Sequence, residues 1–377
     1  MTLLTEYPLL SSDLKNELCN LVLLLKSREE ATSFSIASEV LALFKRILES
    51  CSWENSRQCL EYVRGIGSIL VSVNATELVI GNVLRRTLFI IREECMIGKK
   101  STGISNVYNA KCDDHTAFHA IQTSLSEVLQ GRGDAKQHVL DHGSCNISRL
   151  IMGIVHQLNE LEMELETVLD DIAFQAKDHI PDGARILTLG NSSYVERFFC
   201  DAAVSKQGKC HFEVFLVESA PYCSGHEMAE RLALTGIEST MISDAALYAV
   251  MPLIDIVILP THAVMANGGL ITPSGGHIVA QAACDHAVPV VCLTDLFKLS
   301  PKYPHDPDIF NELSGPNMVL EYKSAQIISN KNQVLNPNFD YIPPELLSLY
   351  VTNHGPYQPS YIYRLLAECY HPEDRIL

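Results

Sequence analysis

The chain has 377 residues, 47% of them hydrophobic and 19% charged, which is the composition of a globular protein long enough for two domains. Its formal net charge is -17, from 28 basic and 45 acidic residues. This charge disfavours non-specific binding to nucleic acid or to an anionic membrane, so we expect basic protein partners, no direct nucleic-acid partner and no membrane partner.

The amino terminus and the cysteines bear on the cellular compartment. The first 18 residues have no basic region ahead of an apolar core, and no window holds the roughly 18 apolar residues that a membrane span needs. The twelve cysteines include no C-x-x-C pair, which is typical of reduced thiols and not of a zinc site or a disulfide framework. We expect a soluble, cytoplasmic protein that holds no metal.

The amino-terminal half predicts packed helices. Over residues 9–94 the apolar side chains recur at helical spacing without a proline. Residues 96–146 are polar and contain scattered Gly, Asn and Asp, which predicts an insertion or linker with one or two short helices. Residues 147–179 also lack proline and carry an apolar stripe at i, i+3/i+4 spacing, which predicts one long connecting helix.

The pattern changes after "IPDG" at residues 180–183, a turn signal that ends the helix. We therefore expect a helical domain over residues 1–179 and a second domain over residues 180–377. In the second domain short apolar runs such as "RILTLG", "FEVFLVES", "IDIVILPT" and "VPVVCLT" alternate with helical patterns. Strands this apolar are buried on both faces, and helical crossovers imply parallel pairing, so the sequence predicts a doubly wound, Rossmann-like α/β domain.

The loops at the carboxyl ends of these strands are the expected place for a ligand. They cover residues 190–193, 218–225, 243–244 and 261–269. The first loop offers backbone N–H groups and two hydroxyls to a phosphate, but it lacks the spaced glycines of a dinucleotide site and the lysine of a P-loop. A simple N-cap by Ser192 or Ser193 is the alternative.

Three further polar positions have both a functional and a structural interpretation. Asp244 ends a strand and opens a helical pattern, where a carboxylate either exchanges protons or caps the helix. His262 and His277 flank a glycine-rich stretch, where a histidine acts as a base or as a hydrogen-bonded structural residue. Histidine pairs at i, i+4 spacing near residues 115–119 and 138–142 lack an acidic third ligand, so metal binding is not expected there.

Two long strings in the second domain carry a resemblance, "VFLVESAPYCSGHEMAERLALTGIESTMISDAALYAVM" and "DIVILPTHAVMANGGLITPSGGHIVAQAACDHAVPVVCLTDLFKLSPKYP". They resemble the family that unites methylthioribose-1-phosphate isomerases with the regulatory subunits of eukaryotic translation initiation factor 2B. The segment "FDYIPPELLSLYVTNHGPYQPSYIYRLLAECYHPED" resembles one of these regulatory subunits in particular, and "GNVLRRTLFIIREE" supports the same assignment. The resemblance covers residues 180–377 closely and the amino-terminal half more loosely.

The resemblance also implies that the isomerase chemistry is absent. The isomerases move protons with a Cys that follows the first strand and with the Asp of a Thr-Asp turn. In this sequence Gly190 stands where that Cys is expected, while Asp244 keeps the carboxylate. One acid/base group alone cannot both remove and return a proton, so the reaction is not expected.

The substrate contacts of the isomerases are missing as well. Their Asp-Arg pair corresponds to His262 and Ala263 here, and the Asp after their Asn-Gly pair corresponds to Gly269. The resemblance thus implies a vestigial pocket in a protein that kept the fold without the reaction, with no cofactor. Its residues are Gly190, Asn191, Ser192, Asp244, His262, Asn267 and Gly268.

The resemblance implies a regulatory subunit of the guanine-nucleotide exchange factor complex that reactivates the translation GTPase carrying initiator tRNA. Such a subunit pairs with the related delta subunit and forms a regulatory core with the alpha subunit. The gamma subunit and the epsilon subunit, which performs the exchange, attach to that core. The core senses phosphorylation of the GTPase's own alpha subunit, the signal of the integrated stress response.

The carboxyl-terminal segment "PSYIYRLLAECY" is rich in the aromatic residues that anchor protein interfaces. Tyr361, Tyr363, Arg364 and Tyr370 are therefore candidates for the subunit interface. The alternative is that these tyrosines close the core of their own domain.

Two other functions stay open. One is a sugar-phosphate isomerase with rearranged catalytic groups, or a metabolite sensor that uses the residual pocket; Gly190 and the missing Asp-Arg pair argue against catalysis. The other is a dinucleotide-dependent oxidoreductase, which is disfavoured because no G-x-G-x-x-G follows any predicted strand.

Overall fold

The amino-terminal part is a bundle of helices. The structure is a computed structural model that describes residues 10–27, 32–101, 147–205, 211–305, 311–320, 333–375 and 377. The bundle contains α1 (Ser12–Ser27), α2 (Ser33–Ser50), α3 (Ser56–Val73), α4 (Leu78–Ser101) and α6 (Ile147–Phe174). Most of the expected insertion at 96–146, with its histidine pairs, lies outside the described residues.

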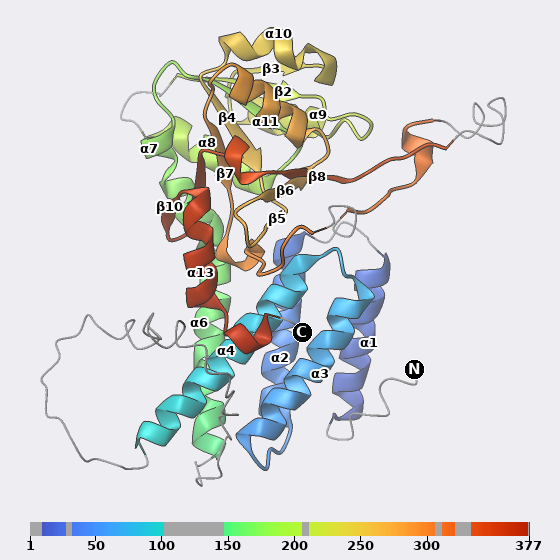
Figure 1. Cartoon of the computed structure of the whole chain (residues 1–377), viewed down its shortest axis with the longest axis vertical. Helices are drawn as coiled ribbons and strands as arrows, with labels where there is room; N and C mark the ends of the chain where they lie inside the picture. Colours follow the sequence, from blue (N-terminus) through green and yellow to red (C-terminus); the bar gives the residue numbers. More distant parts are fainter. Residues whose placement is uncertain are drawn as a thin grey trace, which may run out of the picture.

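Local signals in the sequence set where these helices begin. The Thr32 hydroxyl accepts a hydrogen bond from the N–H of Ser35 at the start of α2, and the Asn55 side chain accepts one from Gln58 at the start of α3. The long helix α6 forms as predicted and buries its apolar stripe. It is followed by the short α7 (Ala176–His179) and leads into the second region (Figure 1).

The second region is built on a seven-stranded sheet with the order β3-β2-β1-β4-β7-β9-β10. Its neighbouring strands are parallel except for the antiparallel pair β9–β10 at one edge. This is the strand order of a doubly wound fold, as predicted, with an antiparallel edge added. The strands are β1 (Arg185–Leu189), β2 (Glu213–Val217), β3 (Ser239–Ile242), β4 (Ile256–Pro260), β7 (Val290–Leu293), β9 (Leu349–Thr352) and β10 (Gly355–Tyr357).

Helices and a second, smaller sheet accompany this sheet. The helices are α8 (Ser193–Ser205), α9 (Ser224–Leu234), α10 (Leu247–Val250), α11 (Gly276–Asp285) and α13 (Ile362–Cys369). Several 3-10 turns occur, including η3 (Asp244–Ala246), η5 (Leu296–Lys298) and η10 (Pro372–Asp374). The small antiparallel sheet has the order β5-β6-β8, from β5 (Ala263–Val264), β6 (Leu270–Pro273) and β8 (Phe339–Ile342).

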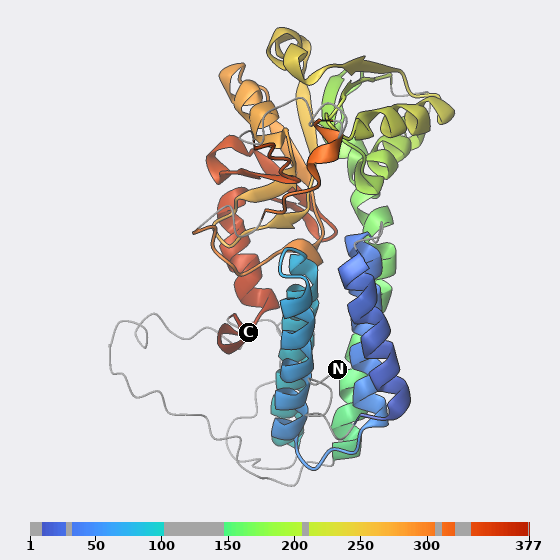
Figure 2. The ribbon, with the colours of Figure 1, turned by 90° about the vertical axis from the view of Figure 1, so that its right-hand side faces the viewer.

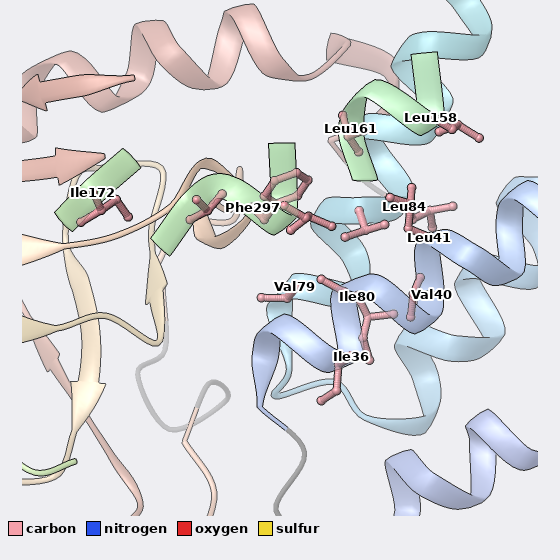
Figure 3. Close-up of a cluster of buried hydrophobic side chains, with 14 of the residues drawn as sticks. Ile36, Val40, Leu41, Val79, Ile80, Leu84, Leu158, Leu161, Ile172 and Phe297 are labelled. Carbon is pink, nitrogen blue, oxygen red and sulfur yellow. The ribbon is translucent and has the colours of Figure 1, made fainter. Parts of the chain in front are cut away.

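A single buried core joins the helical bundle to one face of the large sheet. The cluster runs from Val40 and Leu84 of the bundle through Leu161 of α6 to Phe297 of the second region (Figure 3). The expected boundary between residues 179 and 180 coincides with the end of α7 but stays a prediction, because apolar packing continues across it. Within the described residues, no helix is long and apolar enough to cross a membrane.

The carboxyl-terminal segment returns to the bundle. After the last strand, α13 runs back along the molecule, and the carboxyl end lies beside α4 in both views (Figures 1 and 2). Asp374 in η10 is fully buried there among arginines from α3 and α4. The first and last parts of the chain are therefore packed together.

Candidate functional site

The loops after β1, β2 and β3 lie next to one another because these strands are adjacent and parallel. Gly190 has a φ of +69°, in the left-handed region that favours glycine. A Cβ added there would lie 3.4 Å from Ser224 Oγ and 3.8 Å from Ser219 Oγ, both in the β2 loop. Asn191 donates to Glu227 Oε2 on α9 at 2.8 Å. The β1 loop is thus attached to the β2 loop, as the sequence predicted for a shared edge.

Ser192 stands at the start of α8. Its carbonyl accepts the N–H of Glu196 at 3.0 Å, which is the first helical hydrogen bond. Ser192 is half-buried. This placement agrees with the N-cap interpretation of the position.

Asp244 connects the β3 loop to the β2 loop. Its Oδ2 accepts the backbone N–H of Ala220 at 2.9 Å. The expected helix after it is replaced by the short segments η3 and α10, and the side chain of Asp244 bonds to the neighbouring loop and not to its own helix. One oxygen of the carboxylate is therefore engaged in holding two loops together.

His262 lies on the β5 side of the molecule and packs against the helical bundle. Its ring stacks on Phe339 with 4.1 Å between ring centroids, and its Nε2 lies 3.4 Å from the carbonyl oxygen of Thr76. Burial lowers the pKa of His262. The contacts are those of a structural histidine, the second of the two interpretations that the sequence allowed.

Asn267 and Gly268 form the turn between β5 and β6. The Asn267 amide donates to the Tyr341 hydroxyl at 2.7 Å. Gly268 has a φ of +83°, and a Cβ added to it would lie 2.4 Å from the carbonyl oxygen of Pro359. A Cβ on Gly269 would meet the Tyr341 hydroxyl at 2.4 Å. The place of the isomerases' Asp is thus occupied by the ring of Tyr341.

Four further residues meet between β1 and β4, where the strand order reverses. The sequence did not indicate them as site residues, and we call them the crevice network. They are Tyr194, Thr261, Asp295 and Lys298. The Tyr194 hydroxyl donates to Asp295 Oδ2 at 2.6 Å, and Lys298 Nζ donates to the Thr261 carbonyl at 2.9 Å. Lys298 Nζ also lies 4.2 Å from the centre of the Tyr194 ring. Both charged side chains are buried.

The crevice network occupies the position where doubly wound folds bind their ligands. Burial and the Asp295 carboxylate raise the pKa of Tyr194 far above its ordinary value, so its hydroxyl stays a donor. Lys298 Nζ lies 3.9 Å from Asp295 Oδ2, so the two buried charges are paired with each other. The sequence signal was "LTDLFK", in which Asp295 follows an apolar strand as Asp244 does.

The carboxyl-terminal candidates divide into two groups. The Tyr361 ring stacks on Tyr357 at 5.2 Å with an interplanar angle of 4°, and the Arg364 guanidinium lies 5.5 Å from the Tyr361 ring. Tyr363 is 56% exposed. Tyr370 is buried, and its hydroxyl donates to the Leu299 carbonyl at 2.8 Å. Tyr370 therefore closes the core, as the alternative expected, and Tyr361 is partly buried against the same core, whereas Tyr363 and Arg364 are exposed.

Two hollows in the described part of the surface lie away from these loops. One of about 400 Å³ lies on the helical bundle, lined by Glu49 of α2 and by residues of α6 such as Met152 and His156. Another, of about 10 Å³, lies between Arg86 and Tyr370. Neither contains a residue of the expected vestigial pocket.

Comparison with known proteins places the chain in a family. It matches the model of the initiation factor 2 subunit family over residues 29–359. The translation initiation factor eIF2B subunit beta of Schizosaccharomyces pombe is 35% identical over 379 residues, which cover 94% of this chain and 95% of that protein. The ribose 1,5-bisphosphate isomerase of Archaeoglobus fulgidus is 27% identical over 62% of this chain and 73% of its own length.

Solved structures agree with this assignment. The crystal structure of eIF2B beta from Chaetomium thermophilum matches with a TM-score of 0.71 and 26% identity, over 96% of this chain and 94% of that one. A chain of the tetrameric eIF2B-beta2-delta2 complex from C. thermophilum matches with a TM-score of 0.68 and 25% identity, over 95% of each. The predicted fold and the predicted resemblance, including the similarity to one regulatory subunit in particular, are confirmed. The chain belongs to the initiation factor 2 subunit family.

Proposed function

We propose that this chain is a regulatory subunit of the eIF2B guanine-nucleotide exchange factor, corresponding to its beta subunit, and that it catalyses no reaction itself. The proposal is supported by the similarity to eIF2B beta over nearly the whole chain. The absence of catalysis is inferred chiefly from one observation. Glycines stand at 190 and 269, the positions of two groups that the isomerases use, and the ring of Tyr341 occupies the space beside Gly269.

The second part of the proposal is pairing with the delta subunit. It is supported by the similarity to a chain of the tetrameric eIF2B-beta2-delta2 complex. We assign Tyr361, Tyr363 and Arg364 to this interface because Tyr363 and Arg364 are exposed and Tyr361 is partly exposed, and because tyrosine and arginine are residue types that dominate binding energy at interfaces. The stacking of Tyr361 on Tyr357 holds the Tyr361 ring in place before a partner arrives.

The wider assembly follows from the same family membership. The alpha subunit completes the regulatory core, the gamma and epsilon subunits attach to it, and epsilon performs the exchange. The core contacts the translation GTPase through that GTPase's alpha subunit and senses its phosphorylation in the cytoplasm. The net charge of -17 suits basic partner surfaces.

Two assays test the proposal. In the first, the purified full chain is incubated with methylthioribose 1-phosphate and with ribose 1,5-bisphosphate, and no turnover is expected. Turnover of either substrate would instead support the alternative of an isomerase.

In the second assay, nucleotide exchange on the GTPase is measured with the complete complex and with a complex that lacks this chain. The inhibition by phosphorylated GTPase should disappear in the latter, and unchanged inhibition would contradict a regulatory role.

A metabolite sensor remains the second candidate, because the family includes sugar-phosphate enzymes and the β1, β2 and β3 loops still meet at one edge. Thermal stabilisation of the chain by a sugar phosphate, without turnover, would favour it. Equal melting temperatures with and without the ligand would count against it.

A further inference from the structure

The loop after β2 gathers three side chains that bind metals well. Glu218 directly follows the strand, Cys223 precedes α9, and His226 lies in the first turn of α9. Cys223 Sγ lies 3.8 Å from Glu218 Oε1, and His226 Nε2 lies 3.2 Å from the same oxygen. The three ligand atoms all lie within 4.8 Å of one another. The proposed function uses none of them.

These separations suit a tetrahedral zinc ion. Zinc lies about 2.3 Å from a cysteine sulfur and about 2.0–2.1 Å from a histidine nitrogen or a carboxylate oxygen, so neighbouring ligand atoms are about 3.3–3.6 Å apart. The Cys223–Glu218 and His226–Glu218 separations of 3.8 and 3.2 Å bracket that interval. A thiolate, an imidazole and a carboxylate are also the ligand types that zinc prefers.

The backbone holds the three side chains in this arrangement. The N–H of Cys223 donates to the Ser219 carbonyl at 2.9 Å, and that of Gly225 donates to the Glu218 carbonyl at 3.2 Å. Cys223 has a φ of +53°, a conformation that residues other than glycine rarely adopt. A Cβ on Gly225 would lie 2.2 Å from the Val217 carbonyl oxygen, so α9 begins in direct contact with β2. The loop is therefore preorganised around the thiol.

The charges around the thiol favour a cation. Partial burial and the carboxylates of Glu218 and Asp244 raise the pKa of Cys223. In the described part of the chain His226 is the ion-pair partner of Glu218, and neither carboxylate pairs with a lysine or arginine. A divalent cation bound to the sulfur would offset the negative charge of the two carboxylates and so favour loss of the thiol proton.

We propose that Glu218, Cys223 and His226 bind a zinc ion, with a fourth position open to solvent beside the exposed His226. The ion would join the end of β2 to the start of α9. The inference goes beyond the proposed regulatory function, which requires no metal. The ordinary interpretation is a surface ion pair between His226 and Glu218 beside a free thiol.

Cobalt titration distinguishes these two interpretations, because tetrahedral cobalt bound to a thiolate has a sulfur-to-metal charge-transfer band and strong visible bands. The reduced, metal-free full chain is titrated with Co²⁺, followed by competition with Zn²⁺. We expect one equivalent to give both bands and Zn²⁺ to abolish them. Cys223→Ser should abolish the charge-transfer band, and His226→Ala should weaken binding at least about tenfold. The matched control, Cys284→Ser, changes an exposed thiol at the end of α11 and should leave the spectrum unchanged.

Two results would overturn the proposal. One is a wild-type titration without the charge-transfer band, and the other is a band that persists in Cys223→Ser, because the ion would then lie elsewhere. Glu218→Gln keeps the shape of the side chain and serves as a second variant, with circular dichroism as the check on folding. Pairing with the delta subunit is measured on the same variants and is expected to persist, so failure of the zinc site and failure of the proposed function are distinguishable.

Discussion

Arg92 on α4 binds both carboxylate oxygens of Asp374, with Nε 2.9 Å from Oδ2 and Nη2 3.2 Å from Oδ1, although the two residues are 282 positions apart in the sequence. Arg64 on α3 also pairs with Asp374, and Arg85 donates to the Asp374 backbone carbonyl at 3.1 Å. Arg92 is 20% exposed, whereas the Asp374 side chain is fully buried. This cluster fastens the carboxyl-terminal segment to the helical bundle.

We predict that Asp374→Asn lowers the free energy of unfolding by about 2–3 kcal/mol. Removing one partner of a buried ion pair costs about 3–5 kcal/mol, and the partial exposure of Arg64 and Arg92 reduces that figure. Urea denaturation measures the change. The control, Glu368→Gln, removes an exposed i, i+4 pair with Arg364 and should cost less than about 0.5 kcal/mol. Equal losses in the two variants would show that the buried cluster contributes no more than a surface pair.

The turn at Gly268 gives a second prediction. Gly268→Ala and Gly183→Ala both place a side chain at a left-handed φ, +83° and +78°, which costs about 1–2 kcal/mol. Gly183 has open space around it, whereas the new Cβ at 268 would meet the backbone of Pro359. Gly268→Ala should therefore lower the free energy of unfolding by about 1–3 kcal/mol more than Gly183→Ala does. Thermal unfolding of the two variants side by side measures the difference, and equal melting temperatures would contradict the close contact.

The proposed loss of catalysis predicts the outcome of restoring the missing thiol. Gly190→Cys should give no isomerase activity, because Ala263 and Gly269 still leave the sugar phosphate without its contacts. The variant should also lose about 1–2 kcal/mol of stability through the left-handed φ at this position. Adding Gly269→Asp should destabilise the chain further, since the new side chain would collide with Tyr341. Measurable turnover by the single variant would show that the rest of the site is intact.

The pair of His354 and Glu164 predicts a pH dependence. His354 Nε2 lies 3.2 Å from Glu164 Oε1 on α6, and this hydrogen bond raises the pKa of His354. Because the folded pKa lies above the unfolded value of about 6.5, the stabilisation is complete below that pH and is lost as the pH rises through the folded pKa.

The pH dependence is measured as the difference in free energy of unfolding between the wild type and His354→Gln. The pKa of Glu164 is lowered, with hydrogen bonds from His354 and Asn353 outweighing its burial, so Glu164 stays ionised at about pH 5.5. At that pH we expect the free energy of unfolding of the wild type to exceed that of the variant by about 0.5 kcal/mol, a small value because the pair is partly exposed to solvent. At about pH 8.5 we expect a smaller difference. A difference that grows with pH would refute this assignment.

The proposed interface predicts the effect of removing two tyrosine rings, of which Tyr363 is exposed and Tyr361 is partly buried. Tyr361→Ala combined with Tyr363→Ala should release the delta subunit in a pull-down while the circular dichroism spectrum stays that of a folded chain. The matched control combines Tyr248→Ala with Tyr303→Ala, two tyrosines that are each 46% exposed, and should retain the partner. If the first double variant also retains delta, this surface is not the interface.

The sequence predicted the parts of the fold that depend on local pattern. The strands β1, β2, β4 and β7 were recognised because both of their faces are buried or nearly so, which gives short apolar runs. The small sheet and the β9–β10 edge were missed. They consist of two to four residues each, include Pro273 and Pro356, and form only through pairing with distant segments.

The candidate site also contains residues that the sequence could indicate and residues that only the folded structure reveals. The importance of Gly190 could be inferred from its place after the first strand, and its positive φ fits that position. Asp295 and Lys298 escaped notice because their roles depend on contacts with Tyr194 in α8 and with Thr261 after β4, which are distant in the sequence. Tyr370 could not be separated from Tyr363 by sequence, since only packing decides which ring is covered.

The most direct test of the central claim is the native mass of the full chain co-expressed with the delta subunit. A regulatory subunit of the exchange factor should be recovered in a stable complex that contains both chains and that binds the alpha, gamma and epsilon subunits when these are added. Recovery of this chain only as a monomer or as a homodimer, with delta in a separate fraction, would contradict the account.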